Sequence, residues 1–187
     1  MPLIYMIRHG EAAASWDKDA NPGLSVRGVS QARDVTADMA TRLQKPLPIL
    51  TSPMLRCRET AEALASAWKV QARVEPRVIE VPSPVSDLKE RHLWLRGIMK
   101  GDWAAADKTA PDLILWRKRM MEALMELSED TIVFTHFIAI NAAASFARKD
   151  PRVVNFMPDY CSITLFETGG GELRLLERGR EMETKVK

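Results

Sequence analysis

Cysteine is scarce in this sequence, in which Cys57 and Cys161 are the only two and form no CxxC pair. Two separated thiols are too few for a disulfide framework and give little support to a zinc site. In an intracellular chain they are more often small buried apolar side chains. Neither is followed six positions later by an arginine, because Ala63 and Glu167 stand there. A cysteine nucleophile of the CxxxxxR type is therefore excluded.

An excess of charge is also missing, since 27 Lys and Arg face 25 Asp and Glu, a net charge of +2. So small and dispersed a charge does not favour binding to nucleic acid or membranes. The longest apolar stretch, over 131–147, is interrupted by His136 and falls short of the roughly 20 residues of a membrane span. Arg8, His9 and Glu11 fall where a signal peptide needs its apolar core. We therefore expect a cytoplasmic protein with no nucleic-acid or membrane partner.

The common nucleotide-binding and zinc motifs are absent as well. The chain has neither a GxxxxGK[ST] loop nor a GxGxxG fingerprint, which are the usual backbone cradles for nucleotide phosphates. The HGE triplet at His9–Glu11 is similar to the HxE of zinc deaminases, but no PCxxC accompanies it. We therefore predict no metal and no cofactor, and any anion must be bound by a local arrangement of side chains.

Short apolar runs rich in β-branched residues alternate with longer segments of helical period. This alternation is typical of a mainly parallel sheet with helices on both faces. With 187 residues, 46% of them hydrophobic, the chain is long enough for one packed domain, 1–187. We predict an α/β protein, a three-layer α/β/α sandwich with about six strands. The predicted strands are Leu3–Ile7, Leu47–Leu50, Arg73–Ile79, Thr131–Thr135, Ser162–Glu167 and Glu172–Glu177. The glycines of TGGGE between the last two predict a hairpin at one edge of the sheet.

Helices are predicted where apolar residues recur at helical spacing. The first follows Ser25, a residue type favoured at N-caps; the second spans about 53–68; another follows His136. One more helix carries on a single face Leu113, Trp116, Met120, Leu124 and Leu127. The stretch VPSPVSDLKER, residues 81–91, predicts a loop that leads into a short helix.

Polar residues follow two of the predicted strands at their carboxyl ends. LIYMI precedes Arg8 and His9, and TIVFT precedes His136. In an open α/β sheet, ligands bind beyond these strand ends, where helix N-termini present unpaired N–H groups. One histidine at such a place is more often structural, but two of the chain's three favour a functional site. The third, His92, lies on a predicted helix among charges and is interpreted as a surface or supporting residue.

Two further arginines, Arg56 and Arg58, follow the strand PILTS on the first turns of a predicted helix. At least one can turn toward the edge that carries Arg8, and guanidinium groups bind phosphate oxygens in pairs. Arg58 is more easily explained as a solvated helix residue. Between guanidinium groups an imidazole stays a free base that can attack phosphorus. A well-placed cation contributes roughly 3 to 4 kcal/mol to such a reaction, which needs no metal.

These segments resemble the histidine phosphatase superfamily, also called the phosphoglycerate mutase-like family. RHGE at 8–11, LSVRGVSQA at 24–32, TSPMLRCRETA at 51–61 and VFTH at 133–136 occur in the order of the family's motifs. The resemblance implies that His9 is the phosphate-accepting nucleophile. It also implies that Arg8, Arg56 and His136 bind the transferred phosphoryl group.

The family also uses a general acid, usually a glutamate shortly after the third strand. Glu80 in RVIEVPSP is the best match, and Asp87 and Glu90 on the same connecting segment remain rivals. A carboxyl group in this role needs a raised pKa. Glu11 belongs to the RHGE motif, but a role as a helix cap or an arginine partner is as well supported as a catalytic one.

The sequence departs from the family pattern RHGETxxN, because Ala12 and Ser15 replace the threonine and the asparagine. One contact to the phosphoryl group is then weaker or supplied by Ser15. Phe137 stands where glycine is common, so the pocket is narrower. The segment over 81–100 lacks the loop pattern of dedicated mutases, which favours a phosphatase acting on a small phosphorylated substrate or a phosphoprotein. A phosphoglycerate-type mutase and a phospho-ligand binding module without turnover stay open as alternatives.

Overall fold

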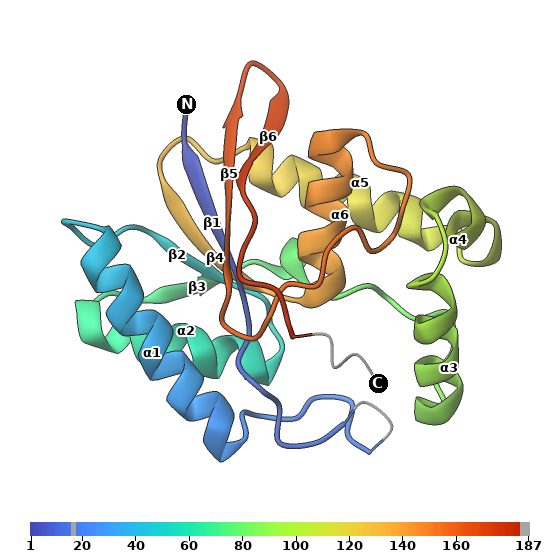
Figure 1. Cartoon of the computed structure of the whole chain (residues 1–187), viewed down its shortest axis with the longest axis horizontal. Helices are drawn as coiled ribbons and strands as arrows, with labels where there is room; N and C mark the ends of the chain where they lie inside the picture. Colours follow the sequence, from blue (N-terminus) through green and yellow to red (C-terminus); the bar gives the residue numbers. More distant parts are fainter. Residues whose placement is uncertain (16–17, 184–187) are drawn as a thin grey trace.

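Six strands pair into one central sheet in the computed structural model, which describes residues 1–15 and 18–183 (Figure 1). The strands are β1 (Leu3–Arg8), β2 (Ile49–Thr51), β3 (Ala72–Val74), β4 (Thr131–Thr135), β5 (Ile163–Gly169) and β6 (Glu172–Glu177). Their order is β3-β2-β4-β1-β5-β6. The first four strands of this order are parallel, whereas β5 is antiparallel to β1 and β6 to β5. The predicted mainly parallel sheet with an edge hairpin is therefore confirmed.

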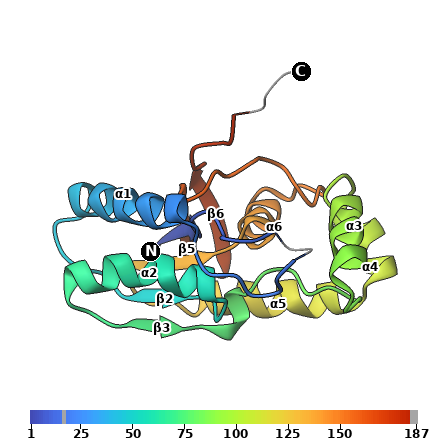
Figure 2. The same ribbon diagram turned by 90° about the horizontal axis from the view of Figure 1, so that it is seen from below.

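Helices cover both faces of this sheet. They are α1 (Val26–Arg42), α2 (Leu55–Trp68), α3 (Leu88–Ile98), α4 (Trp103–Thr109), α5 (Asp112–Met125) and α6 (Phe137–Arg148). Both ribbon views place α1 and α2 on one side of the strands and α3 to α6 on the other (Figures 1 and 2). Because side chains alternate along a strand, β1 serves both interfaces. Ile4 and Met6 pack in the cluster with α5 and α6, while Tyr5 and Ile7 pack with α1 and α2. The three-layer prediction is confirmed.

The third predicted strand, Arg73–Ile79, is wrong in length. Strand β3 ends at Val74, and Pro76 begins a short 3-10 turn, η1 (Pro76–Val78). Proline has no N–H to donate to a β-ladder, so the strand cannot continue through it. The Glu75 carboxylate accepts a hydrogen bond from the backbone N of Arg77 at 3.0 Å and holds the turn. The chain therefore leaves the sheet edge earlier than the apolar pattern suggests.

This turn is fastened to the end of β4. The hydroxyl of Thr135 donates to the backbone carbonyl of Val78 at 2.7 Å, and both residues are buried. Glu80 follows two residues later and is thereby held near the start of α6, which begins at Phe137. A side-chain contact between two distant segments thus decides where the candidate acid lies.

The predicted helices are present with shifted ends. Ser25 caps α1 as predicted, since its hydroxyl oxygen accepts from the backbone N of Gly28 at 2.9 Å. Helix α2 begins at Leu55, two residues after the expected start, and α5 ends at Met125. The short helix expected after the proline-rich loop is α3, whereas α4 was not predicted. Membrane crossing would require a longer and more apolar helix than any that the structure describes.

Candidate active site

The two strand-end histidines meet because β1 and β4 are neighbours in the sheet. Arg8 and Thr135 are paired in register, and the backbone N of His9 donates to the carbonyl of Thr135 at 3.0 Å. His9 and His136 therefore leave the same edge side by side. Their ring centroids lie 5.3 Å apart with an interplanar angle of 66°. Both imidazoles are buried, so the sequence prediction brings together two groups that are 127 residues apart along the chain.

Arg56, on the first turn of α2, lies between the two histidines. Its Nε lies 3.2 Å from Nε2 of His9, and its Nη2 lies 3.2 Å from Nδ1 of His136. The side chain is 2% exposed, so solvent screens its charge little. Arg58, two residues further along α2, is exposed, as expected for a solvated helix residue. Of the two arginines in TSPMLRCRETA, the structure places only Arg56 among the histidines.

The tautomer of His9 follows from its hydrogen bonds. Nδ1 lies 2.7 Å from the carbonyl oxygen of Gly10, which can only accept, so Nδ1 carries the proton. Nε2 is then an unprotonated acceptor, and it receives the Nε–H of Arg56. Burial lowers the pKa of His9 well below its ordinary value, and the charges of Arg56 and Arg8 lower it further. The ring is held as a free base with its lone pair facing a guanidinium group.

His136 is held by a residue that the sequence did not single out. Its Nε2 lies 2.7 Å from the hydroxyl of Ser52, which directly follows β2. Burial lowers its pKa well below the ordinary value, and the proximity of His9 and Arg56 adds to this. The backbone N of Ser52 donates to the carbonyl of Phe134 at 2.9 Å, which fixes the hydroxyl at the end of β4. The position of Ser52 after a strand ending at the same sheet edge was the only signal that could have identified it.

Cys57 lies against the same histidine. Its Sγ is 3.4 Å from Nε2 of His136 and donates to the carbonyl of Thr135 at 3.4 Å. Burial raises the pKa of this thiol, so it stays protonated. Cys57 and Cys161 are both buried and unpaired, as the cysteine spacing predicted. Cys57 therefore donates to the backbone of Thr135 and packs against the ring of His136.

Arg8 reaches the site from the end of β1 and is held by aromatic rings. Its guanidinium carbon lies 4.0 Å from the ring centre of Tyr160 and 5.1 Å from that of Phe137. Nη1 donates to the carbonyl of Pro158 at 2.9 Å. Within the described part of the chain, the buried Nε of Arg8 has no hydrogen-bond partner. Sequence reasoning missed Tyr160, which comes from a loop before β5.

Glu80 is buried at the N-terminus of α6, with 4% of its surface exposed. Its Oε2 accepts from the backbone N of Ile138 at 3.2 Å, and its Oε1 accepts from those of Ala139 at 3.2 Å and Val81 at 2.9 Å. Burial raises the pKa of Glu80 above its ordinary value. The N–H donors and the charges of Arg56 and Arg8 oppose this but do not cancel it. A buried carboxyl group with a raised pKa is the state that a general acid requires.

The rival carboxylates have other roles in the structure. Asp87 is exposed and caps α3 by accepting from the backbone N of Lys89 and of Glu90, each at 3.0 Å. Glu90 is also exposed, on the first turn of the same helix. Neither lines the hollows at the site among the residues that the structure describes. The geometry therefore favours Glu80.

Two hollows open at this sheet edge. The first, of about 390 Å³, is lined by Arg8, His9, Ala12, Ala13, Ala14, Ser15, His92, Leu95, Arg96, Met99 and Tyr160. The second, of about 440 Å³, includes Arg56, Glu80 and Arg91 in its lining. Helix α3 borders both, because Arg91 faces one and His92 the other. Ser15 is exposed and lies in the wall of the His9 hollow.

Gly10 is needed because the chain at this position approaches α1 closely. Its φ angle is not positive, but a Cβ placed there would lie 2.7 Å from the carbonyl oxygen of Gly28. A Cβ on Gly28 would in turn overlap the carbonyl oxygen of Glu11.

The Glu11 carboxylate accepts from the hydroxyl of Ser25 at 2.8 Å and lies 3.7 Å from Arg27. The Glu11 carboxylate thus binds the capping residue Ser25 and pairs with Arg27 at the start of α1.

Metal-ligand geometry is not found in the part of the chain that the structure describes. Within residues 1–15 and 18–183, no three His, Cys, Asp or Glu side chains are grouped as a metal site. What the described residues offer instead is a pair of neutral imidazoles, two buried guanidinium groups and one buried carboxyl group at a single sheet edge. This combination suits transfer of a phosphoryl group to nitrogen.

Comparison with known proteins agrees with the class that this geometry indicates. Residues 4–180 match the family model of the histidine phosphatase superfamily, branch 1. The match covers nearly the whole chain, and the protein belongs to this superfamily. A relative of 36% identity over 98 residues is an uncharacterised protein of a Picosynechococcus strain. That match covers 49% of this chain and 55% of the relative, so the chain spans about half the length of the curated relative that it matches.

Solved structures share the fold over its full length. The phosphoserine phosphatase of Entamoeba histolytica, solved with 3-phosphoglyceric acid, superposes with a TM-score of 0.75 at 17% identity and covers 96% of this chain and 98% of its own. A mycobacterial glucosyl-3-phosphoglycerate phosphatase, solved with inorganic phosphate, gives a TM-score of 0.68 at 19% identity. The superposition covers 97% of this chain and 98% of the mycobacterial one. At these identities the likeness establishes the fold.

Proposed function

We propose that this protein is a phosphatase that hydrolyses phosphate monoesters through a phosphohistidine on Nε2 of His9. The observation that carries the proposal is the state of this atom. Nε2 is an unprotonated nitrogen in a buried ring whose pKa is lowered, and it contacts a guanidinium group on Arg56. A nitrogen in that state is a nucleophile, and the cation beside it attracts a phosphate dianion to it.

In the first step, Nε2 of His9 attacks phosphorus, and the bond from phosphorus to the ester oxygen breaks. Arg8 and Arg56 offer N–H groups to the three phosphoryl oxygens, and the unpartnered Nε of Arg8 supplies one of them. His136, held by Ser52, adds another contact to this group. As substrate binds, a phosphoryl oxygen replaces Nε2 of His9 as the acceptor of the Arg56 Nε–H, which frees the lone pair of Nε2 for the attack. We further propose that Ser15 contacts the phosphoryl group or the ester.

Glu80 serves as the acid in this scheme. Its raised pKa favours a carboxyl group that holds a proton, which it gives to the leaving oxygen as the ester bond breaks. The resulting carboxylate then accepts a proton from the water that attacks the phosphohistidine. Inorganic phosphate leaves, and both His9 and Glu80 return to their starting states. Every step uses side chains of this chain, so the mechanism requires no metal.

The proposal is tested by trapping the covalent intermediate. Wild type and His9→Ala are incubated with an aryl phosphate in the presence of a chelator, and turnover is measured together with acid-labile protein-bound phosphate. We expect turnover and a labile phosphoenzyme in the wild type and neither in His9→Ala. Arg33→Gln, at an exposed position of α1 that lines neither hollow, serves as the comparison. Ordinary turnover in the His9 variant would remove the nucleophile assignment.

The size of the site supports a small phosphorylated substrate over a phosphoprotein. The His9 hollow holds about 390 Å³, which suits a small metabolite.

We also infer a cytoplasmic location, which the two unpaired cysteines favour. Cell fractionation with an antibody to the protein tests this location, and recovery in a periplasmic or extracellular fraction would contradict it.

A further inference from the structure

One face of α3 forms a wall of the hollow that contains the nucleophile. His92, Leu95, Arg96 and Met99 line it, and their spacing of three or four residues places them on the same side of the helix. Leu95 is buried, so the helix is held by its apolar side chains while its charged ones border the hollow. The face of α3 formed by His92 and Arg96 plays no part in the phosphoryl-transfer scheme above.

The charge in this hollow is of one sign. Its described lining contains two guanidinium groups, those of Arg8 and Arg96, beside the neutral imidazole of His9 and the side chain of His92. No carboxylate contributes to the lining among residues 1–15 and 18–183. Over the same residues, the side chains of His92 and Arg96 make no hydrogen bond or ion pair. Two guanidinium groups without a carboxylate among these residues contrast with the near balance of 27 basic and 25 acidic side chains over the whole chain.

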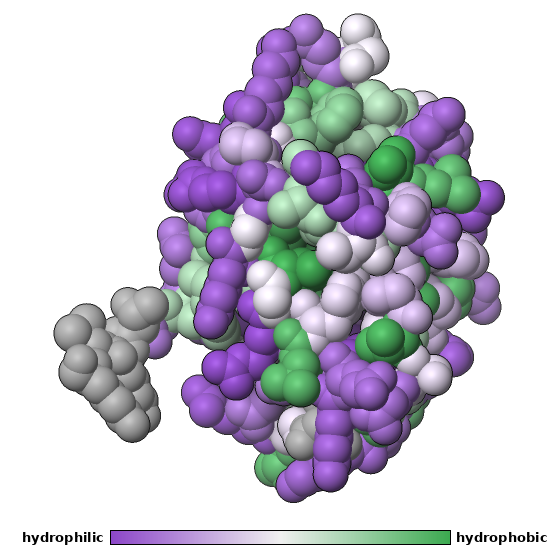
Figure 3. Space-filling view, turned by 90° about the vertical axis from the view of Figure 1, so that its right-hand side faces the viewer, coloured by the Kyte–Doolittle hydropathy of each residue, from purple (hydrophilic) through white to green (hydrophobic). Residues whose placement is uncertain are grey.

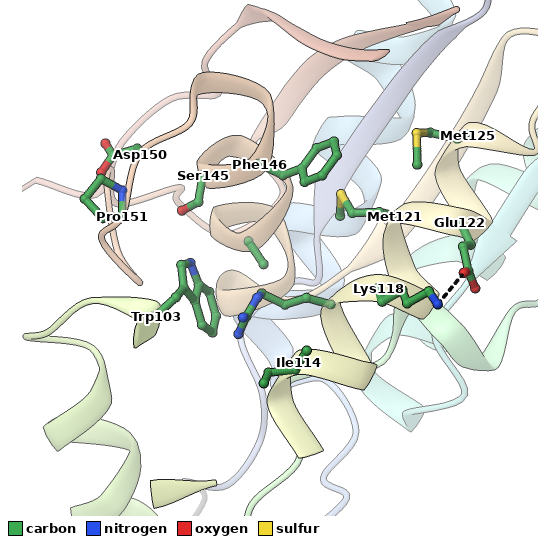
Figure 4. A pocket seen from close by; sticks show the side chains of 12 residues that line it. Trp103, Ile114, Lys118, Met121, Glu122, Met125, Ser145, Phe146, Asp150 and Pro151 are labelled. Carbon is green, nitrogen blue, oxygen red and sulfur yellow. Dashed lines mark ion pairs between the residues drawn. The ribbon is translucent and has the colours of Figure 1, made fainter. Parts of the chain in front are cut away.

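The cations of a second, larger hollow, which lies between α4, α5 and α6, differ from those of the His9 hollow (Figure 4). This hollow, of about 550 Å³, also contains two cations, but each has a carboxylate partner. Arg117 pairs with Asp107 through two hydrogen bonds, of 2.8 and 2.7 Å, and Lys118 lies 3.9 Å from Glu122. Neutralised cations of this kind are structural. Arg96 and His92 have no such carboxylate partner in the described residues.

The surface around α3 does not indicate another binding role for this helix, such as docking of an apolar partner. Seen from the side of α3 to α6, apolar side chains form separate patches among hydrophilic ones (Figure 3). A broad apolar docking surface is therefore not visible on this face. The positions that distinguish α3 are its cationic ones beside the nucleophile.

We propose that His92 and Arg96 bind a second anionic group on the part of the substrate that leaves, so that the enzyme prefers phosphomonoesters that carry a carboxylate or a second phosphate. This inference rests on the proposed phosphatase function. The apolar groups of Leu95, Met99 and Tyr160 contact the carbon skeleton between the two anions and reduce the screening of the charges. Arg91, which faces the hollow of Glu80, extends the cationic face toward the leaving oxygen.

The test uses substrate pairs that differ by one anionic group. We compare kcat/KM for 3-phosphoglycerate and glycerol 3-phosphate, which differ by a carboxylate, and for fructose 1,6-bisphosphate and fructose 6-phosphate, which differ by a phosphate. An aryl phosphate reports the basic phosphatase reaction. We expect at least a tenfold preference for the member of one pair that carries the additional anionic group, as for a single charge-assisted contact. The pair that shows it identifies the second group.

The variants test whether α3 causes that preference. Arg96→Gln removes the charge with little change in size, and Arg96→Lys retains it. Arg33→Gln, an exposed arginine on α1 that lines neither hollow, is the matched control. We expect Arg96→Gln to reduce the preference about tenfold, mainly through KM, and Arg96→Lys to keep much of it. His92→Asn should reduce it less.

The outcomes separate this inference from the phosphatase proposal. Equal kcat/KM within both pairs in the wild type, or a preference unchanged in Arg96→Gln, overturns the α3 site while aryl phosphate turnover leaves the phosphatase standing. If the wild type turns over none of these substrates, including the aryl phosphate, the phosphatase proposal is overturned. In that case calorimetric binding of 3-phosphoglycerate and glycerol 3-phosphate still decides on the α3 site, because tighter binding of the former, weakened by Arg96→Gln, needs no reaction.

Discussion

The guanidinium carbon of Arg8 lies 4.0 Å from the ring centre of Tyr160, and this contact orients the arginine beside the nucleophile. Tyr160 also lies near His9, with 6.0 Å between the ring centroids. A residue 152 positions further along the chain thus helps to determine which edge of Arg8 faces the phosphoryl group.

We expect Tyr160→Leu to reduce kcat/KM about tenfold, because a cation–π contact in a desolvated place contributes about 1 to 2 kcal/mol. Tyr160→Phe keeps the aromatic face and should retain most of the activity. Steady-state kinetics with an aryl phosphate and competition by inorganic phosphate measure the effect on binding and on turnover. Equal loss in both variants would show that the hydroxyl group matters and the ring does not.

Glu80→Gln should slow esters with poor leaving groups by about a hundredfold or more, because a proton is needed on the departing oxygen. An aryl phosphate with an acidic phenol needs less protonation and should be affected less. Glu90→Gln, at an exposed position on α3, is the control. The slope of log kcat against leaving-group pKa is compared among the wild type and the two variants, and we expect a steeper slope only in Glu80→Gln. A steeper slope in Glu90→Gln instead would identify Glu90 as the acid.

The two buried histidines should make the fold less stable in acid. Their pKa values are lowered in the folded protein by burial, so below the ordinary pKa near 6.5 the unfolded chain binds more protons. The free energy of unfolding should therefore be fully retained above pH 6.5 and fall as pH drops below it, by about 1.4 kcal/mol per pH unit for each histidine. Glu80, whose pKa is raised, contributes in the opposite direction, since its share is lost as pH rises.

Urea unfolding at pH 7.5, 6.5 and 5.5 measures this dependence, and the difference between wild type and His136→Asn isolates one histidine from Glu80. We expect the variant to lose less stability between pH 6.5 and 5.5 than the wild type. Parallel curves for the two proteins would mean that His136 is protonated in the folded state.

Two helical glycines provide a matched pair for testing the close approach at the nucleophile loop. A Cβ on Gly28 would overlap the carbonyl oxygen of Glu11, whereas a Cβ on Gly97 of α3 would meet nothing within 4 Å. We expect Gly28→Ala to destabilise the fold by about 2 kcal/mol or more and to lower turnover, because the backbone next to His9 must shift. Gly97→Ala should be neutral or stabilise by up to about 1 kcal/mol, the usual gain of alanine over glycine in a helix. Chemical denaturation and turnover of both variants check this, and equal stability would contradict the close approach.

Much of the fold follows from local patterns. The runs LIYMI and TIVFT are strands because their β-branched and apolar residues suit a buried sheet, and the structure places strands β1 and β4 there. Ser25 begins α1 because its hydroxyl satisfies a free backbone N–H. The prediction fails where apolar character competes with a backbone constraint, as at Pro76, which ends β3 early.

Only part of the candidate site could be predicted from such local sequence patterns. His9, His136 and Arg56 could be selected because each stands at a strand end or a helix start, and such places converge in a parallel sheet. Ser52 and Tyr160 could not, since serine after a strand and tyrosine in a loop have many uses. Their contacts with His136 and Arg8 depend on how β2, β4 and the loop before β5 pack against each other.

The sequence by itself determined the class of fold, the residues that reach the carboxyl edge of the sheet and the scarcity of thiols, because these depend on periodicity and residue type along short segments. Only the tertiary structure decided that β4 lies between β1 and β2, which brings His136 between His9 and Ser52. It also decided that Glu80 is buried against α6 and that α3 turns its cations toward the nucleophile. These features are contacts between segments far apart in the chain, and their energies arise from burial and charge in three dimensions, which no local pattern encodes.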